Sequence, residues 1–298
     1  METLLERLGR GEILVGDGAW GTELMTRGLE PGQCPESFNI SRPHVLAEIA
    51  ASYLDAGAQI VTTNTFGGSP LRLRSYGLEE RTEAINRRAV EVLREVTGDR
   101  AYVSGSVGPT GKMIKPYGDT EEDQVYDAFE RQIRALAEAE ADLICVETMI
   151  DLREASLAVQ AAKAVAPAIP VMATMTFDPT PRGFFTVMGT DIERAVKGLE
   201  LAGADVVGSN CGNGIETMVA IARELGRHAE RPIAIQSNAG LPERREGEIV
   251  YPESPAFMAQ RVPDLIDLGV AVIGGCCGTT IEHINAIRRS ANRLRKAE

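Results

Sequence analysis

The sequence lacks the surplus of positive charge that nucleic-acid-binding proteins carry. Among its 298 residues, 43 Asp and Glu outnumber 31 Lys and Arg, which gives a net charge of −12. A basic patch or stripe is the electrostatic footprint of a nucleic-acid partner. The sequence also lacks any uninterrupted apolar run close to the roughly 18–20 residues that cross a bilayer. We therefore expect no nucleic-acid partner and no membrane partner.

Cysteines are few, and their odd number argues against a disulfide framework. The five are Cys34, Cys145, Cys211, Cys276 and Cys277. The first ten residues are charged and amphipathic, unlike the apolar stretch of a secretory leader. Because disulfides persist mainly in oxidising compartments, we expect a cytoplasmic protein. Cys145 lies within an apolar run and Cys34 within a loop rich in Pro and Gly, so we interpret both as non-catalytic.

Histidines and phosphate-binding motifs are scarce as well. His44, His228 and His283 lie in helical patterns, and we interpret them as surface or capping residues rather than metal ligands. The glycine-rich segment 105–108 lacks the full phosphate-binding pattern and the lysine of a P-loop. We predict no nucleotide site there.

What the sequence does contain is a regular alternation of short apolar runs, polar or glycine-rich clusters and helical patterns. The runs cover residues 13–15, 60–61, 101–103, 143–146, 171–173, 233–235 and 270–273, with one more that ends at Cys211. Strands that alternate with helices indicate a parallel α/β sheet. Eight repeats in this length predict a single (β/α)8 TIM barrel domain over residues 1–298, with the site at the carboxyl ends of the strands. An open, doubly wound sheet is the alternative.

Several helix starts are well marked. Thr120, Asp151 and Thr190 each precede a carboxylate by three residues, as helix-capping residues do. Ser254 stands before a proline, which suits the first position of a helix. Pro263 should kink or split the helix that follows.

Two adjacent cysteines in a glycine frame, Cys276 and Cys277 within 274–278, are the most informative feature. Neighbouring side chains of a strand point to opposite faces, so both thiols can serve one metal only where the strand has ended and the backbone bends. Cys211 stands at the end of another apolar run. Three thiolates at strand ends predict a zinc site with an open fourth position. Asn238 would lie beside them, either as a turn residue or in the metal site, and a redox-active vicinal pair is the alternative for the cysteines.

Two carboxylates, Asp17 and Glu147, directly follow buried runs. Asp151 and Glu154 are placed to cap the fourth helix, which leaves Glu147 for the pocket. Two carboxylates at the mouth of a barrel, next to a metal, would suit the ammonium group of a substrate.

The chain resembles the homocysteine S-methyltransferase family across nearly its whole length. The matching motifs are Asp17-Gly18-Ala19-x-Gly21-Thr22, Thr63-Asn64-Thr65-Phe66, residues 105–110, Glu147-Thr148, Asn210-Cys211-Gly212, Asn238-Ala239-Gly240-Leu241-Pro242 and residues 274–280. The resemblance implies a zinc-containing barrel that methylates the homocysteine sulfur to give methionine. It implies zinc ligands at Cys211, Cys276 and Cys277, substrate contacts at Asp17, Gly18, Thr63, Glu147 and Asn210, and a catalytic role near the zinc for Asn238.

The resemblance is greatest to the homocysteine domain of cobalamin-dependent methionine synthase. The chain has no Asp-x-His-x-x-Gly corrinoid-binding motif, so we expect the methyl donor to come from outside. A separate methyl-corrinoid protein, with methylcobalamin bound to that partner, is the favoured donor, and a small compound such as S-methylmethionine or betaine is the alternative. Trp20 and the pair Gln236-Ser237 depart from residues common in the family, so thiols other than homocysteine stay open.

The chemistry follows from the residues. A free thiol has a pKa of roughly 8.5 and reacts as the thiolate, and zinc coordination deprotonates a bound thiol. Methyl transfer to that thiolate would be an in-line displacement that needs no general base. A zinc- or redox-sensing thiol barrel is the alternative of another class, but it has no use for Asp17 and Glu147 as an amino-acid clamp.

Overall fold

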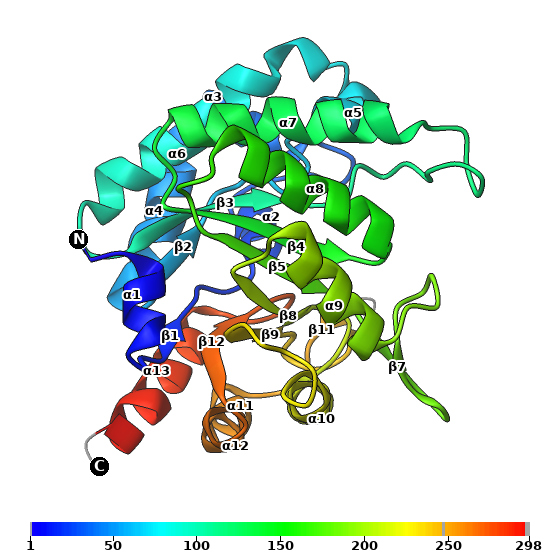
Figure 1. The fold of residues 1–298 in the computed structure, drawn as a ribbon. Helices are drawn as coiled ribbons and strands as arrows, with labels where there is room; N and C mark the ends of the chain where they lie inside the picture. The colour runs from blue at the N-terminus through cyan, green and yellow to red at the C-terminus, as the bar shows by residue number, and fades with distance from the viewer. Residues whose placement is uncertain (1, 246–247, 296–298) are drawn as a thin grey trace.

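The computed structural model describes residues 2–245 and 248–295, and its main sheet contains eight parallel strands. In chain order these are β1 (Leu14–Val15), β2 (Ile60–Thr62), β3 (Tyr102–Val107), β4 (Leu143–Met149), β5 (Val171–Met175), β8 (Val206–Asn210), β9 (Ile233–Ser237) and β12 (Val270–Gly275). From β2 to β12 each strand pairs with the next one of the barrel, and β12 pairs with β1. A bridge between Gly16 and Ile60 joins β1 to β2. The strands therefore form the predicted barrel and not the open sheet (Figure 1).

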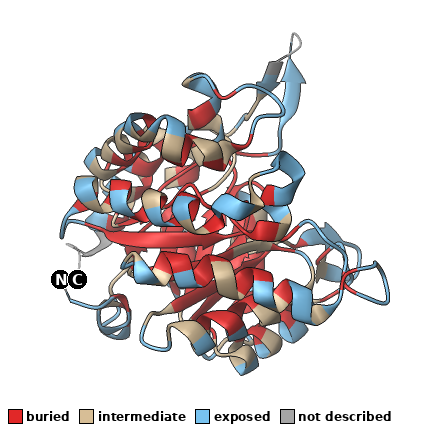
Figure 2. Ribbon diagram, turned by 90° about the horizontal axis from the view of Figure 1, so that it is seen from above, coloured by how far each residue is buried: buried red, intermediate tan, exposed pale blue. Residues whose placement is uncertain are grey.

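Helices follow the strands and cover the outside of the barrel. They are α4 (Pro43–Asp55), α6 (Thr82–Thr97), α7 (Glu122–Glu138), α8 (Leu152–Val165), α9 (Ile192–Ala202), α10 (Ile215–Leu225), α11 (Pro255–Ala259), α12 (Val262–Asp267) and α13 (Ile281–Arg295). Their buried faces turn toward the strands and their exposed faces toward solvent (Figure 2). Within the described residues, every helix is too short or too polar to cross a membrane.

The helix boundaries match the sequence in part. Asp151 caps α8 and Ser254 caps α11. Pro263 lies in the first turn of a separate helix, α12, so the expected split of the helix that begins after Ser254 is confirmed. The caps of α7 and α9 are Glu121 and Asp191, one residue later than predicted. Thr120 instead forms a β-bridge with Ile114, and Thr190 forms hydrogen bonds with Thr186. Both partners lie in the loops that precede the helices.

Glu154 does not cap α8 as predicted. Its Oε1 accepts hydrogen bonds from the backbone N–H of Thr110, at 2.8 Å, and from the Thr110 hydroxyl, at 2.6 Å. Spacing along the helix suggested a local contact, but the carboxylate reaches the loop after β3 instead. The side chain therefore ties the first turn of α8 to the loop after β3.

Two hairpins and several short helices extend the loops at the carboxyl ends of the strands. The hairpins are β6 (Asp178–Thr180) with β7 (Gly183–Phe185), after β5, and β10 (Glu243–Arg245) with β11 (Glu248–Val250), after β9. The short helices are α2 (Trp20–Thr26), η1 (Pro35–Ser37), α3 (Phe38–Ser41), α5 (Pro70–Leu73), η2 (Arg74–Tyr76) and η3 (Glu79–Arg81). Most of the polypeptide outside the regular barrel thus lies where the sequence analysis places the site.

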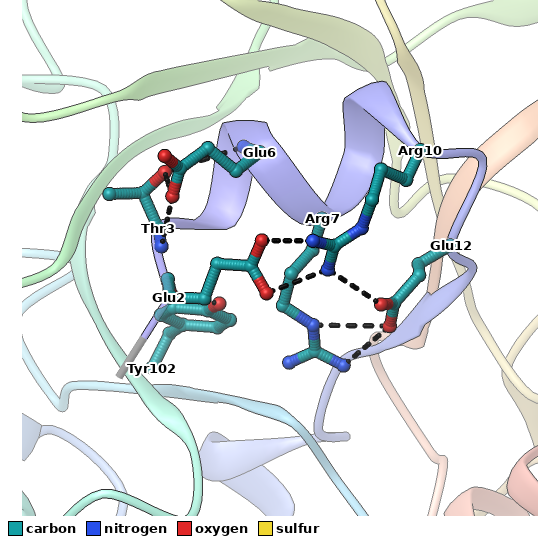
Figure 3. A network of polar contacts seen from close by, with 7 residues as sticks. All are labelled: Glu2, Thr3, Glu6, Arg7, Arg10, Glu12 and Tyr102. Atoms are coloured by element: carbon teal, nitrogen blue, oxygen red, sulfur yellow. Dashed lines mark hydrogen bonds and ion pairs between the residues drawn. The ribbon is translucent and has the colours of Figure 1, made fainter.

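The amino end of the barrel is closed by α1 (Leu4–Gly9). Leu4 and Leu8 pack into one buried cluster with inward-facing strand residues that include Leu14, Ile60, Tyr102, Leu143, Val206 and Val272. Polar contacts surround this helix (Figure 3). Arg7 and Arg10 pair with Glu12, Arg10 also pairs with Glu2, and the Tyr102 hydroxyl donates to the Glu2 carbonyl at 2.6 Å. The helix therefore covers the interior with apolar side chains and is held in place by charged ones.

Candidate metal and substrate site

Three cysteines meet at the carboxyl end of the barrel. Cys211 directly follows β8, and Cys276 and Cys277 directly follow β12. Their sulfur atoms all lie within 4.8 Å of one another, and the sulfurs of Cys211 and Cys277 are 3.8 Å apart. Cys211 itself has a left-handed backbone, with φ of 61°, and Gly278 has φ of 77°. The strands have therefore ended and the backbone bends, as the use of adjacent thiols requires.

The spacing of the sulfurs fits a tetrahedral metal. Two sulfurs that each lie about 2.3 Å from a tetrahedral zinc are about 3.8 Å apart, and the Cys211–Cys277 distance has this value. Three protein ligands leave a fourth position, which is the arrangement of catalytic rather than structural zinc sites. Soft thiolate ligands exclude magnesium and calcium, which prefer oxygen. The donor set and its geometry therefore suit zinc.

Asn238 lies beside the cluster, on the loop after β9, the strand between β8 and β12. Its side chain is close enough to Cys211 to help lower the pKa of that thiol, and its backbone N–H donates to the carbonyl of Asn213, in the loop of Cys211, at 3.0 Å. Its Oδ1 is buried and has no hydrogen-bond partner among the described residues. Hydrogen bonds from Cys276 and Cys277 are the main cause that lowers the pKa of Cys211. The cluster thus favours a thiolate and places an unused amide oxygen next to it.

Glu147 is half-buried at the end of β4 and lines a cavity of about 280 Å³ together with the three cysteines. The Ser106 hydroxyl donates to its Oε1 at 2.5 Å, and Asn210 Nδ2 lies 3.4 Å from its Oε2. Desolvation is the main cause that raises the pKa of Glu147 to about 7, and the Asp17 charge adds to it. No cation pairs with Glu147 among the described residues, so the carboxyl is suited to receive one from a ligand.

Asp17 lies across the same cavity and is buried. The Trp20 indole N–H donates to its Oδ2 at 2.7 Å, as does the backbone N–H of Thr62 at 2.6 Å. Burial raises the pKa of Asp17 to about 6, although these hydrogen bonds oppose the shift. The carboxylate is therefore held in one orientation, and Trp20, which the sequence analysis noted only as a departure, is one of the groups that hold it.

The other expected substrate residues differ in their positions. Gly18 and Thr63 line the cavity. A methyl group on Gly18 would come within 2.8 Å of the Thr279 hydroxyl, so only glycine fits. The Thr63 hydroxyl accepts from the backbone N–H of Ser106 at 3.0 Å and so fixes the end of β3.

Asn210 lies behind the cavity wall and does not line it. Its Nδ2 donates to the Thr148 hydroxyl at 2.7 Å, approaches Glu147, and lies 3.9 Å from the Cys276 sulfur. Its Oδ1 accepts from the backbone N–H of Thr148 at 2.7 Å and from the Thr174 hydroxyl. Asn210 thus links the acidic side of the site to the cysteine side, which is a positioning role.

The sequence analysis missed Glu36, a third carboxylate that lines the cavity. It is buried, its Oε1 accepts from the backbone N–H of Gly67 at 2.6 Å, and its Oε2 accepts from the Cys34 thiol at 3.2 Å. Burial and the nearby Glu36 charge raise the pKa of Cys34 to about 12, which agrees with its interpretation as non-catalytic. Nothing in the local sequence distinguishes Glu36, because its partners come from other segments.

The remaining candidates lie away from the cluster. Cys145 is buried within β4. His44 is exposed, and His228 is half-buried beside Glu224. His283 is buried rather than on the surface, but it does cap: its Nδ1 accepts from the backbone N–H of Thr280 at 3.1 Å, at the start of α13. The cysteine cluster contains no histidine.

Comparison with known proteins gives a consistent result. The sequence matches the homocysteine S-methyltransferase family over residues 14–291. It is 33% identical to a methionine synthase from Mycobacterium tuberculosis and 34% identical to one from Mycobacterium leprae, over 96% and 98% of this chain. The chain spans about a quarter of the length of these relatives (25% of each).

Solved structures show the same fold. The homocysteine methyltransferase MmuM from Escherichia coli matches in its metallated form with a TM-score of 0.78 and 23% identity, over 95% of this chain and 97% of that one. Its oxidised form matches with a TM-score of 0.76 and 25% identity, over 93% and 95%.

Proposed function

Because this chain belongs to the homocysteine S-methyltransferase family, we propose that it is an enzyme that transfers a methyl group to the thiol of homocysteine and forms methionine, using zinc. One observation carries the proposal. Three cysteine sulfurs with the spacing of a tetrahedral site line the same cavity as two carboxyls that have no cation partner among the described residues. A ligand that places a thiol at the metal and an ammonium group at the two carboxyls is an amino acid with a short thiol side chain.

The cysteines Cys211, Cys276 and Cys277 would hold the zinc. When bound, zinc would supply the charge that deprotonates a substrate thiol and keeps it reactive as a thiolate. The chain's own contribution is to keep the three sulfurs on bent loops at the ends of β8 and β12. Asn238, with its unpartnered Oδ1, is the neutral group that would face the fourth position before substrate binds.

Glu147 and Asp17 would hold the substrate ammonium group. Desolvation raises the pKa of each carboxyl, so a bound cation should restore their ionised forms. Ser106 and Asn210 orient Glu147, and Trp20 and Thr62 orient Asp17. The hydrogen bonds are therefore already arranged, and binding needs no rearrangement of these side chains.

The donor is proposed to be a separate methyl-corrinoid protein that carries methylcobalamin. Support comes from the motifs shared with the homocysteine domain of cobalamin-dependent methionine synthase and from relatives named methionine synthase. A small donor of the S-methylmethionine or betaine type is the alternative. We further propose that residues 1–298 form one homocysteine-binding barrel domain. Its five free cysteines suit a reducing, cytoplasmic location.

The test is a methyl-transfer assay with purified, zinc-loaded protein. Homocysteine is offered with free methylcobalamin, S-methylmethionine or betaine, and methionine is measured. If methionine forms with methylcobalamin and with neither of the other two donors, the corrinoid donor is supported. If methionine forms with S-methylmethionine or betaine, the alternative is supported. If the protein binds zinc but calorimetry shows that it does not bind homocysteine, the proposal is contradicted and the thiol-sensing barrel is favoured.

A further inference from the structure

Three consecutive residues, Tyr251, Pro252 and Glu253, contact the three loops that carry the metal-site residues. Each contact is made at a glycine. A methyl group placed on Gly278 would come within 2.0 Å of the Tyr251 side chain, and one placed on Gly240 would come within 2.9 Å of Pro252. Gly278 follows Cys277, and Gly240 follows Asn238 by two residues. The segment 251–253, which comes after hairpin β10–β11, therefore fits into spaces that only glycine leaves open.

The third contact joins Glu253 to the loop of Cys211. A methyl group on Gly214 would come within 2.0 Å of the Glu253 carboxylate. Gly214 is the N-cap residue of α10 and has no side chain to offer. Glu253 supplies the missing cap, because its Oε2 accepts from the backbone N–H of Ile215 at 2.9 Å. A residue from another loop thus fixes the start of the helix that follows Cys211.

Backbone hydrogen bonds of Glu253 tie the same segment to the other two loops. Its N–H donates to the carbonyl of Ala239 at 2.9 Å, and its carbonyl lies 2.9 Å from His283 Nε2. His283 Nδ1 accepts from the backbone N–H of Thr280, so His283 Nε2 is free to donate to Glu253. The segment is therefore fixed to the loop of Asn238 and to the start of α13, three residues after Cys277.

We propose that Tyr251 and Glu253 are positioning residues for the three-cysteine site. Glu253 fixes the loop of Cys211 relative to the loop of Asn238, and the Tyr251 ring packs against Gly278, the residue after Cys277. The inference rests on the proposed function, because it assumes that these sulfurs hold a metal. Groups that contact metal ligands from outside typically change metal affinity about 10- to 100-fold when they are removed.

The first test concerns the Tyr251 ring. Tyr251→Ala removes the ring that packs against Gly278, whereas Tyr251→Phe keeps it. The control is Tyr117→Ala, at an exposed tyrosine in the loop after β3. With cobalt(II) as the probe, we expect Tyr251→Ala to shift the sulfur-to-cobalt charge-transfer absorption and to weaken metal binding about 10-fold, measured against a chromophoric chelator. We expect Tyr251→Phe to keep most of the affinity and Tyr117→Ala to match the unmodified protein in both measurements.

The second test concerns the Glu253 carboxylate. Glu253→Ala removes the cap of α10 and should weaken metal binding about 10-fold. Glu253→Gln keeps an oxygen that can accept from Ile215 and should restore most of the affinity. Glu216→Ala, which removes an exposed carboxylate from the first turn of the same helix, is the control and should leave the affinity unchanged.

The outcomes separate this inference from the proposed function. Metal affinity and cobalt spectra that are unchanged in both Tyr251→Ala and Glu253→Ala, in a protein that binds one metal, would overturn the inference alone. Equal losses in the control variants would overturn it too, because the effect would then be general. An unmodified protein that binds no metal through its cysteines would overturn both proposals.

Discussion

At the amino end of the barrel, helix α1 covers the interior with Leu4 and Leu8, whereas at the carboxyl end the interior opens into the cavity of the three cysteines. The same eight strands supply both ends. At the amino end their inward-facing residues form a continuous apolar cluster. At the carboxyl end they lead to thiols, carboxyls and an amide oxygen that has no hydrogen-bond partner in the described part of the chain.

The charged side chains at the two ends also differ in whether they have partners within the protein. At the amino end, Arg7 and Arg10 pair with glutamates (Figure 3), and hydrogen bonds from Thr3 lower the pKa of Glu6. At the carboxyl end, burial raises the pKa values of Asp17 and Glu147, and no basic side chain pairs with either among the described residues. The charged side chains at the amino end are paired within the protein. Among the described residues, Asp17 and Glu147 have no basic partner, and the ammonium group of a substrate would supply one. This difference indicates that the amino end serves stability and that the carboxyl end is suited to ligand binding.

The largest expected effect is the loss of the metal in Cys276→Ser. Zinc sites with four ligands bind with about 10–16 kcal/mol, or roughly 2.5–4 kcal/mol for each ligand, so metal affinity should fall about a hundred- to a thousandfold and methyl transfer should cease. Metal analysis and the methyl-transfer assay check this. Cys145→Ser, in the interior below the site, is the matched control and should keep one metal per chain. Full metal content in Cys276→Ser would show that the cluster is not the metal site.

The next effect concerns the amino end. Leu8→Ala should lower the free energy of unfolding by about 2–3 kcal/mol, because it leaves a cavity beneath α1. Leu5→Ala, on the exposed side of the same helix, should cost much less. Denaturant unfolding measures both. Metal affinity should be unchanged in the folded variants, and a large loss of metal in Leu8→Ala would mean that the two ends are not independent.

A smaller effect is expected for Glu147→Gln at the carboxyl end. A charge-assisted hydrogen bond contributes about 1.5–3 kcal/mol, so homocysteine affinity should fall roughly 10- to 150-fold with zinc still bound. Calorimetry with homocysteine and with 3-mercaptopropionate, which has no amino group, separates the causes. If both thiols weaken equally, Glu147 supports the metal or the fold and does not recognise the ammonium group.

The smallest effect is on pH dependence, measured without metal or substrate. Glu147 binds its proton more tightly in the folded protein, with a pKa of about 7 against 4.5 unfolded. Its contribution to stability is therefore complete below pH 4.5 and is lost as the pH rises through 7. We expect the free energy of unfolding to fall by on the order of 2 kcal/mol between pH 5 and pH 8, and the fall to shrink in Glu147→Gln.

The amino end supplies the control for that measurement. The pKa of Glu6 is lowered in the folded protein, so its contribution is present above pH 4.5 and is lost as the pH falls. Glu6→Gln should therefore lower stability by a constant amount above pH 5, change the pH dependence only on the acid side, and leave the slope between pH 5 and pH 8 intact. An equal change of that slope in both variants would contradict the contrast between the two ends.

The sequence predicts the barrel and the cysteine cluster because both depend on local patterns. Apolar runs of strand length mark each strand, and glycines beside Cys211 and Cys277 mark the bends after β8 and β12. Strand order then brings the sulfurs together without further information. Family resemblance adds the assignment of Asp17 and Glu147 to the substrate.

Contacts between loops were beyond the reach of local patterns. Glu154 was expected to cap its own helix, but it bonds to Thr110. Glu36 and the Tyr251–Glu253 segment act on residues far away in the sequence, and their neighbours give no spacing signal. Such side chains are placed by the packing of several loops at once, so only the folded structure shows them.

The most direct test of the metal-bound thiol is zinc X-ray absorption of the zinc-loaded protein, with and without selenohomocysteine. Without ligand, the spectrum should show three sulfur neighbours at about 2.3 Å and one lighter neighbour. With selenohomocysteine, the lighter neighbour should be replaced by selenium. A zinc spectrum that gains no selenium neighbour, although calorimetry shows the ligand bound, would contradict the claim that the three-cysteine end of the barrel receives the substrate thiol.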